Sequence, residues 1–101
     1  MILVDTSVWV NHLGAGDQSL AALLNAGRVL AHPFMIGELA LGALRQRAQI
    51  LDDLSNLPQI GVAADAEVLK LIDRYALFDR GIGYIDVHLL AAVRLSSGTA
   101  L

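Results

Sequence analysis

The sequence contains no cysteine, only two prolines, and seven Lys and Arg residues against ten Asp and Glu. Without cysteine the chain forms no disulfide and no Cys-based zinc site, which fits a reducing cytoplasm. No apolar run approaches the roughly 18 residues of a membrane span, and the N-terminus lacks the basic segment of a signal peptide. The net charge of −3 has the wrong sign for binding nucleic acid by bulk charge. The composition therefore predicts a cytoplasmic protein with no membrane contact.

Hydrophobic residues, by contrast, make up 55% of the 101 residues. A chain of this length forms one domain, and a domain this small leaves much of its surface exposed. Some apolar area should therefore remain on the surface, where a partner or a second copy of the chain can cover it.

The N-terminal stretch is the most informative part of the chain. Residues 1–4 are apolar without polar alternation, as in a strand buried on both faces, and Asp5 falls where this strand should end. In an open α/β sheet the carboxyl end of an inner strand faces the ligand crevice. The alternative is structural, because Asp often caps a helix or occupies a turn, and Thr6 or Ser7 can also cap the helix that follows.

Short strands and helices alternate along the rest of the chain. Further strands are expected at residues 28–31, 59–62 and 99–101, and helices at 6–13, 18–25, 33–47 and 48–55, from the Asp65 cap to about 76, and from 84 to about 93. This alternation predicts a single three-layer α/β/α domain with a central parallel sheet and right-handed crossovers.

Glu38 is one of only two glutamates and lies in a helix that is otherwise almost entirely apolar. We expect that helix to begin at Pro33, with His32 as a surface or capping residue, and to end with Arg45 and Arg47, whose charge suits a helix C-terminus. The usual interpretation of a glutamate, an acid on a solvated face, is weaker in these surroundings.

Asp86 lies in the first turn of a helix that is apolar nearly all round, and we expect this helix to be buried at the centre. The helix dipole alone would account for an acid at this position. His88 lies about 200° round the helix from Asp86, so both cannot face one metal, and we interpret His88 as a packing residue.

Asp5, Glu38 and Asp86 are all predicted at one rim of the sheet. Clustered carboxylates repel each other by roughly 3 kcal/mol per pair at ~5 Å and an effective dielectric constant near 20, so such a cluster indicates a bound cation. Oxygen ligands without Cys or a facing His favour Mg²⁺ or Mn²⁺ over zinc. A hard divalent ion of this kind supports phosphoryl hydrolysis.

Three motifs in register carry a family resemblance. The segments Asp5-Thr6-Ser7, Glu38-Leu39-x-x-Gly42-x-x-Arg45 and Gly83-Tyr84-Ile85-Asp86-x-His88 resemble the PIN domain, specifically the VapC-type toxins of bacterial toxin–antitoxin pairs. The resemblance implies a metal-dependent endoribonuclease that cuts RNA such as tRNA or rRNA, forms a homodimer and is neutralised by an antitoxin. It implies that Asp5, Glu38 and Asp86 are metal ligands, that Thr6 or Ser7 positions water, and that Arg45, Arg47 and Arg80 contact phosphates.

The sequence departs from this family at its end. Family members usually continue along the last strand to a fourth carboxylate, whereas this sequence stops at Leu101, so we expect a weak first metal site and little or no second one. One ion held by the three acids would change the formal charge from −3 to −1.

Other classes of protein fit the sequence less well. A haloacid-dehalogenase-type phosphatase needs a second Asp at position 7, which is Ser, and a receiver domain needs a late lysine, whereas Lys70 is the only lysine. No glycine-rich nucleotide-binding motif is present. The main alternative is a catalytically degenerate PIN-like module that only binds a protein partner.

Overall fold

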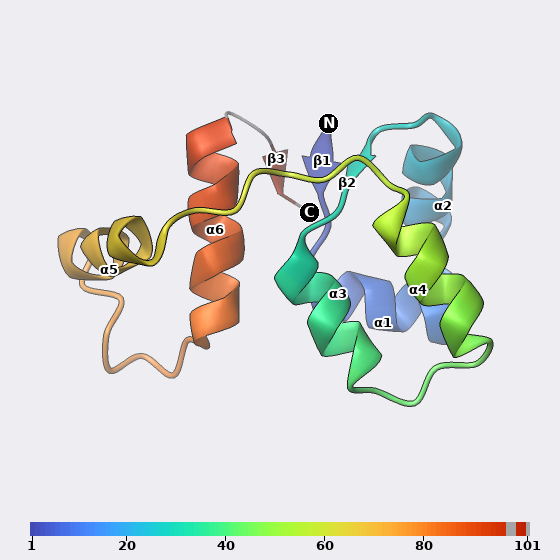
Figure 1. Cartoon of the computed structure of the whole chain (residues 1–101), viewed down its shortest axis with the longest axis horizontal. Coiled ribbons are helices and arrows are strands. Elements are labelled where there is room, and N and C mark those ends of the chain that lie inside the picture. The colour runs from blue at the N-terminus through green and yellow to red at the C-terminus, as the bar shows by residue number, and fades with distance from the viewer. Residues whose placement is uncertain (97–98, 101) are drawn as a thin grey trace.

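The computed structural model describes residues 1–96 and 99–100. The elements in chain order are β1 (Ile2–Leu3), α1 (Thr6–Gly14), α2 (Gln18–Asn25), β2 (Val29–Leu30), α3 (Pro33–Ala40), α4 (Arg47–Ser55), α5 (Asp65–Arg74), α6 (Tyr84–Ser96) and β3 (Thr99–Ala100). Figure 1 shows α5 and α6 on the β3 side of the short sheet and α1 to α4 on the β2 side. The α/β class with a parallel sheet is confirmed.

Strand β1 is the centre of the sheet, whose order is β2-β1-β3. It pairs in parallel with both neighbours, Ile2 opposite Val29 on one side and Thr99 on the other. Leu3 and Val4 are fully buried, as expected for a strand covered on both faces. The predicted strand at 99–101 is confirmed for residues 99–100, and residue 101 lies outside the described part of the chain.

The predicted strand at residues 59–62 is wrong. The structure has only a single parallel bridge there, between Ala31 and Gln59. Two backbone bonds make it: Ala31 N–H donates to the Pro58 carbonyl, and Ile60 N–H donates to Ala31. Pro58 has no N–H to extend the ladder backwards along the chain, and Pro33, the first residue of α3, has none to extend it towards residue 62, so the pairing stops after one residue.

Helix α3 is shorter than predicted and ends at Ala40, not at Arg47. The apolar sequence continues beyond Ala40, but Leu41 is 91% exposed, so no packing extends the helix. Arg47 lies at the start of α4, and its guanidinium donates a hydrogen bond of 2.9 Å to the Ala40 carbonyl. It therefore contributes to the C-terminus of α3 from outside the helix.

Side-chain caps begin three of the helices. Asp5 caps α1, so the structural alternative for Asp5 is correct and neither Thr6 nor Ser7 is the cap. His32 caps α3 as predicted, its Nδ1 accepting from Phe34 N–H at 3.0 Å, but it is fully buried and not a surface residue. Asp65 is not a cap, because the N-cap of α5 is Ala64 and Asp65 lies in the first turn.

Helix α6 joins two apolar cores, which explains why it is apolar nearly all round. Leu89 and Ala92 belong to the larger core with Trp9, a core residue as predicted, whereas Val87 and Ala91 pack with α5 in a smaller core. His88 lies between these two sets of α6 residues and is also buried. Within the described residues, no helix is both long and apolar enough to cross a membrane.

The buried cap at His32 predicts a pH dependence of stability. Burial, together with the nearby His88, lowers the pKa of His32 in the folded protein below its value of about 6.5 in the unfolded chain. The unfolded chain therefore binds the proton more readily. The contribution of neutral His32 to the free energy of unfolding is complete above about pH 6.5 and is lost as the pH falls towards the pKa of His32 in the folded protein. The slope cannot exceed about 1.4 kcal/mol per pH unit for one proton.

His32→Asn keeps a capping oxygen and removes this titration. We expect urea unfolding between pH 7.5 and 5 to give a smaller loss of stability in His32→Asn than in the wild type, whatever the absolute stability of the variant. Equal slopes in the two proteins would contradict the assignment.

Candidate active site

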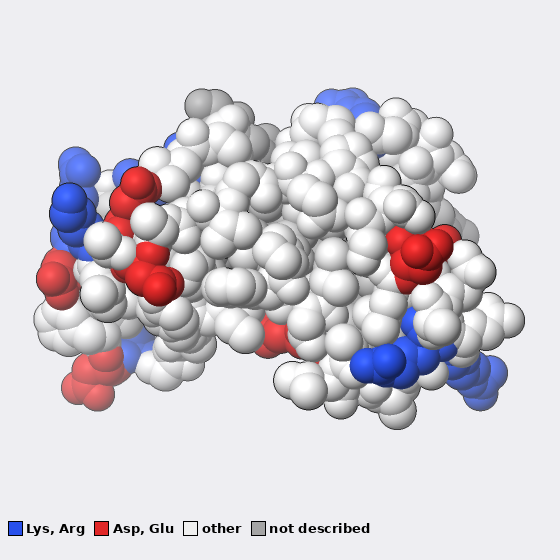
Figure 2. Space-filling model, in the orientation of Figure 1, with Lys and Arg blue, Asp and Glu red and all other residues white. Residues whose placement is uncertain are grey.

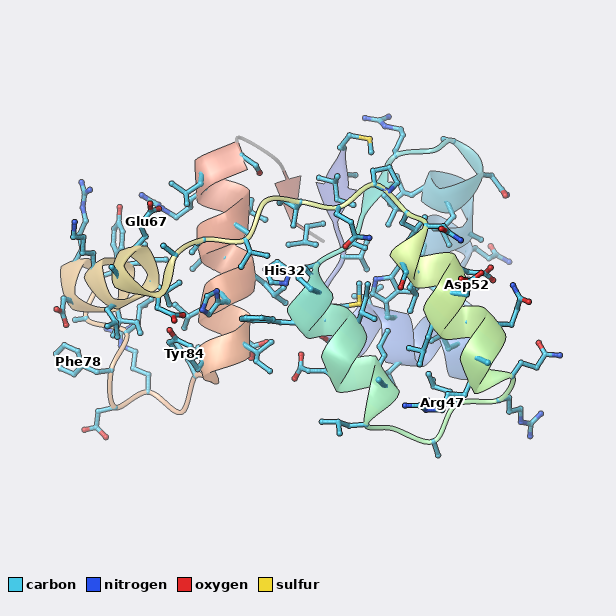
Figure 3. All side chains as sticks on the ribbon, viewed as in Figure 1. His32, Arg47, Asp52, Glu67, Phe78 and Tyr84 are labelled. Atoms are coloured by element: carbon cyan, nitrogen blue, oxygen red, sulfur yellow. The ribbon has the colours of Figure 1, made fainter. Side chains whose placement is uncertain are left out.

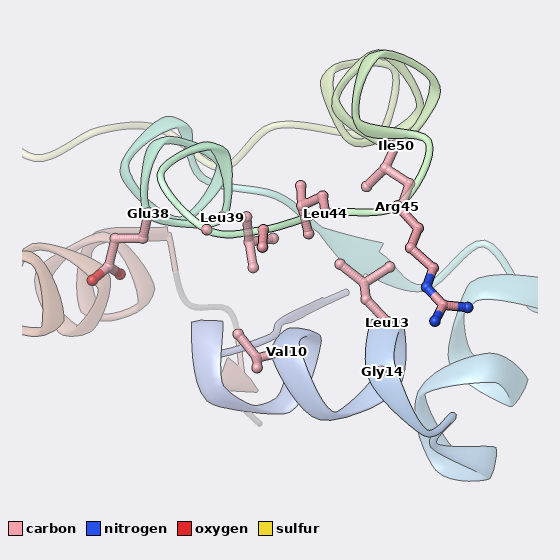
Figure 4. A pocket seen from close by; sticks show the side chains of 10 residues that line it. Val10, Leu13, Gly14, Glu38, Leu39, Leu44, Arg45 and Ile50 are labelled. Atoms are coloured by element: carbon pink, nitrogen blue, oxygen red, sulfur yellow. The ribbon is translucent and has the colours of Figure 1, made fainter.

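The three predicted acids lie on three different elements. Asp5 follows β1 and caps α1, Glu38 is in the second turn of α3, and Asp86 is in the first turn of α6. Figure 4 shows the Glu38 carboxylate directed towards α6. Partial desolvation raises the pKa of Asp86, and the negative charges of Asp5 and then Glu38 raise it further. The fold therefore brings the three carboxylates within electrostatic range of one another.

Hydroxyl groups from the start of α1 hold two of these acids. Thr6 Oγ1 donates to Glu38 Oε1 at 2.8 Å, and Ser7 Oγ donates to Asp5 Oδ2 at 2.6 Å. Ser7 N–H lies 3.4 Å from the same Asp5 oxygen. Within the described part of the chain, Asp5 Oδ1 and Glu38 Oε2 accept no hydrogen bond. Thr6 and Ser7 thus orient the carboxylates and leave one oxygen of each for another ligand.

The donor chemistry at this site suits a hard divalent cation. The three carboxylates and two hydroxyls supply only oxygen, and the chain contains no cysteine. Among the described residues, no three His, Cys, Asp or Glu side chains form a group that could hold a metal ion in the observed geometry. A cation bound between the acids would relieve the repulsion that raises the pKa of Asp86.

The predicted arginines are not brought together. Arg45 and Glu38 line one cavity of about 470 Å³ between α1, α3 and the start of α4, and Figure 4 shows them at its opposite ends. Arg47 is bound to the end of α3, and Arg80 lies in the loop between α5 and α6. On the face shown in Figure 2, the Lys and Arg side chains lie towards the edges of the molecule, and its centre carries none of them. Of the three arginines, only Arg45 is among the residues that line the cavity with Glu38.

Sequence reasoning missed a cluster around Asp65. Tyr84 Oη donates to Asp65 Oδ1 at 3.0 Å, and His88 Nε2 lies 3.1 Å from the same oxygen. Desolvation and the Asp65 carboxylate raise the pKa of Tyr84. Tyr84 and His88 are four residues apart and therefore lie on one face of the helix, so the sequence indicated that they could share a partner. The spacing did not indicate that this partner is Asp65.

Residues 2–101 match the PIN domain family. Ribonuclease VapC32 of Mycobacterium tuberculosis, in the strains CDC 1551 and H37Rv, is 48% identical over 101 residues, which cover all of this chain and 82% of that protein. No solved structure gives a significant match.

Two substitutions separate the capping role of Asp5 from its charge. In Asp5→Asn the side-chain oxygen can still cap α1, and the variant loses a charge that repels Glu38 and Asp86. Its stability in EDTA should therefore equal or exceed that of the wild type. Asp5→Ala removes the cap and should cost about 0.5–2 kcal/mol. Chemical unfolding measures both.

Asp17 provides the matched control, because it caps α2 by accepting from Leu20 N–H at 3.0 Å. Asp17→Ala should lose at least as much stability as Asp5→Ala, because Asp5→Ala also removes a charge that the other acids repel, whereas Asp17→Asn should show no gain. A clear loss of stability in Asp5→Asn would mean that its charge is not repelled by the other two acids.

Proposed function

The chain belongs to the PIN domain family, among the VapC-type ribonucleases, and from this premise we propose that it is a metal-dependent endoribonuclease. It would hydrolyse phosphodiester bonds of RNA such as tRNA or rRNA, as the toxin of a type II toxin–antitoxin pair. The observation that supports this most directly is the charge coupling of Asp86 to Asp5 and Glu38, three acids from separate elements.

In this proposal Asp5, Glu38 and Asp86 hold Mg²⁺ or Mn²⁺. When bound, the ion would polarise a phosphate oxygen and lower the pKa of a coordinated water. Thr6 and Ser7 keep the Glu38 and Asp5 carboxylates oriented through their hydrogen bonds. Arg45, which lines the same cavity as Glu38, would contact a neighbouring phosphate of the RNA, whereas Arg47 and Arg80 have weaker support.

A cognate antitoxin and a second copy of the chain are the proposed protein partners, in the cytoplasm. Large apolar side chains remain exposed on the surface, among them Val10 at 58%, Leu41 at 91% and Phe78 at 62%. Apolar area of this kind is typical of surfaces that another protein covers.

The chemistry is tested by cleavage of RNA. We expect the wild type to cleave RNA in Mg²⁺ or Mn²⁺ and to stop in EDTA. Asp86→Asn should lower the cleavage rate by more than the roughly 10–100-fold that loss of an outer-shell partner costs, because a ligand itself is lost. Asp73→Asn, with the same charge change on the exposed face of α5, is the control and should leave cleavage intact.

Metal binding, together with RNA cleavage, separates the two candidate functions. A cation that binds only the folded protein stabilises it by about 2.7 kcal/mol at 100 times its Kd, and Asp86→Asn should lose this gain. If millimolar Mn²⁺ stabilises neither protein and no RNA is cleaved, the degenerate interaction module becomes the better interpretation.

The homodimer is tested by mass. We expect light scattering of the wild type at micromolar concentration to give twice the mass of one chain, because burial of exposed apolar area favours association. A strictly monomeric mass over this range would contradict the proposal.

A further inference from the structure

Asp65 lies outside the set of residues assigned to the reaction, yet two side chains from α6 converge on one of its oxygens. Tyr84 Oη and His88 Nε2 both lie within 3.1 Å of Asp65 Oδ1. These two residues flank Asp86 by two positions on each side. The Asp65 side chain is 80% exposed, whereas that of His88 is only 1% exposed. A surface acid on α5 is therefore bonded to the buried histidine next to a candidate metal ligand.

The hydrogen-bond partners of the two buried histidines determine which ring nitrogen carries the proton. A carboxylate only accepts hydrogen bonds, so His88 Nε2 carries the proton that it donates to Asp65, and Nδ1 of the neutral ring is an acceptor. His32 Nδ1 accepts from Phe34 N–H, so in the neutral ring the proton is on Nε2. Among the described groups, His88 Nδ1 and His32 Nε2 have no hydrogen-bond partner, and both are buried.

At the contact between α3 and α6, His88 Nδ1 is therefore an acceptor and His32 Nε2 is a donor, and neither has a hydrogen-bond partner among the described groups. The Phe34 ring packs against both, with its centroid 5.2 Å from that of His32 and 4.7 Å from that of His88. Figure 3 shows His32 at the start of α3, facing α6. Helix α3 carries Glu38 and helix α6 carries Asp86, so the two acids lie on the two helices that meet at this contact.

The loop before α6 does little to hold the helix. Residues 78–82 are all described, and none of them makes a backbone–backbone hydrogen bond. Among the described residues, the contacts of Tyr84 and His88 with Asp65 are the side-chain hydrogen bonds that join the first two turns of α6 to another element.

We propose that Asp65 is a positioning residue: through Tyr84 and His88 it fixes the first two turns of α6 against α3, and so sets the spacing of Asp86 from Glu38. This inference rests on the proposed nuclease function. A purely structural alternative is that Asp65, in the first turn of α5, only stabilises that helix through its dipole.

The test compares the wild type with Asp65→Ala, Asp65→Asn and Glu67→Ala. The Asn oxygen can still accept both bonds, so Asp65→Asn separates hydrogen bonding from charge. Glu67 lies in the same first turn, carries the same charge and is labelled in Figure 3; it makes no hydrogen bond to α6, so it is the matched control.

Two measurements are made at neutral to slightly alkaline pH. The ¹⁵N shifts of the imidazoles, recorded without metal, should show protonated Nε2 in both His32 and His88 of the wild type. That state of His88 should persist in Asp65→Asn and Glu67→Ala and be lost in Asp65→Ala. The Kd for Mn²⁺, from calorimetry, should rise about 10–100-fold in Asp65→Ala, the usual cost of losing an outer-shell partner. It should stay near the wild-type value in the other two variants.

The outcomes are distinguishable. If the wild type binds no Mn²⁺, the proposed nuclease function fails. If the wild type binds Mn²⁺ and Asp65→Ala binds it equally well, or if Asp65→Asn is as weak as Asp65→Ala, only the positioning role is overturned. Should Asp65→Ala not fold, Tyr84→Phe removes one of the two bonds while Asp65 stays in place. Weaker Mn²⁺ binding by Tyr84→Phe then supports the proposal, and unchanged binding refutes it.

Discussion

The packing of α6 against α3 is the constraint on which the rest of the molecule depends. The sheet has only two residues in each strand, which is too little to hold several helices by backbone pairing alone. Helix α6 instead contributes to both apolar cores, Leu89 and Ala92 to one and Val87 and Ala91 to the other. Because its two faces are both buried, α6 has little freedom to rotate, and the position of Asp86 follows from that packing.

Polar groups of the site also meet at the contact between α3 and α6. Burying neutral histidines at a helix contact is costly unless their nitrogens find partners, and here each ring has one nitrogen bonded, His32 to Phe34 N–H and His88 to Asp65. Across the contact, the charges of Asp5 and Glu38 reach Asp86 and raise its pKa. The fold therefore holds like charges near each other by apolar packing, an arrangement that a bound cation would stabilise.

Asp5 combines two roles that sequence reasoning had set against each other. It caps α1, which accounts for an acid at this position, and its charge also contributes to the raised pKa of Asp86. Only one of its oxygens is used by Ser7, so capping and ligation do not compete for the same atom. A helix cap at the carboxyl end of a central strand is in this case also a member of the candidate site, because the strand end and the helix start are the same point of the fold.

The sequence by itself determined the features that depend on local chemistry. The bounds of α2, the cap at His32 before Pro33, the acid at the end of β1 and the family all follow from residues close in the chain or from motifs in register. The tertiary structure alone decided the rest. Helix α3 stops at Ala40 because nothing packs on Leu41, although the apolar sequence continues beyond it. The bonding of Asp65 to Tyr84 and His88 joins residues 19 and 23 positions apart, and no periodicity of α5 or α6 specifies which side chains meet across two packed helices.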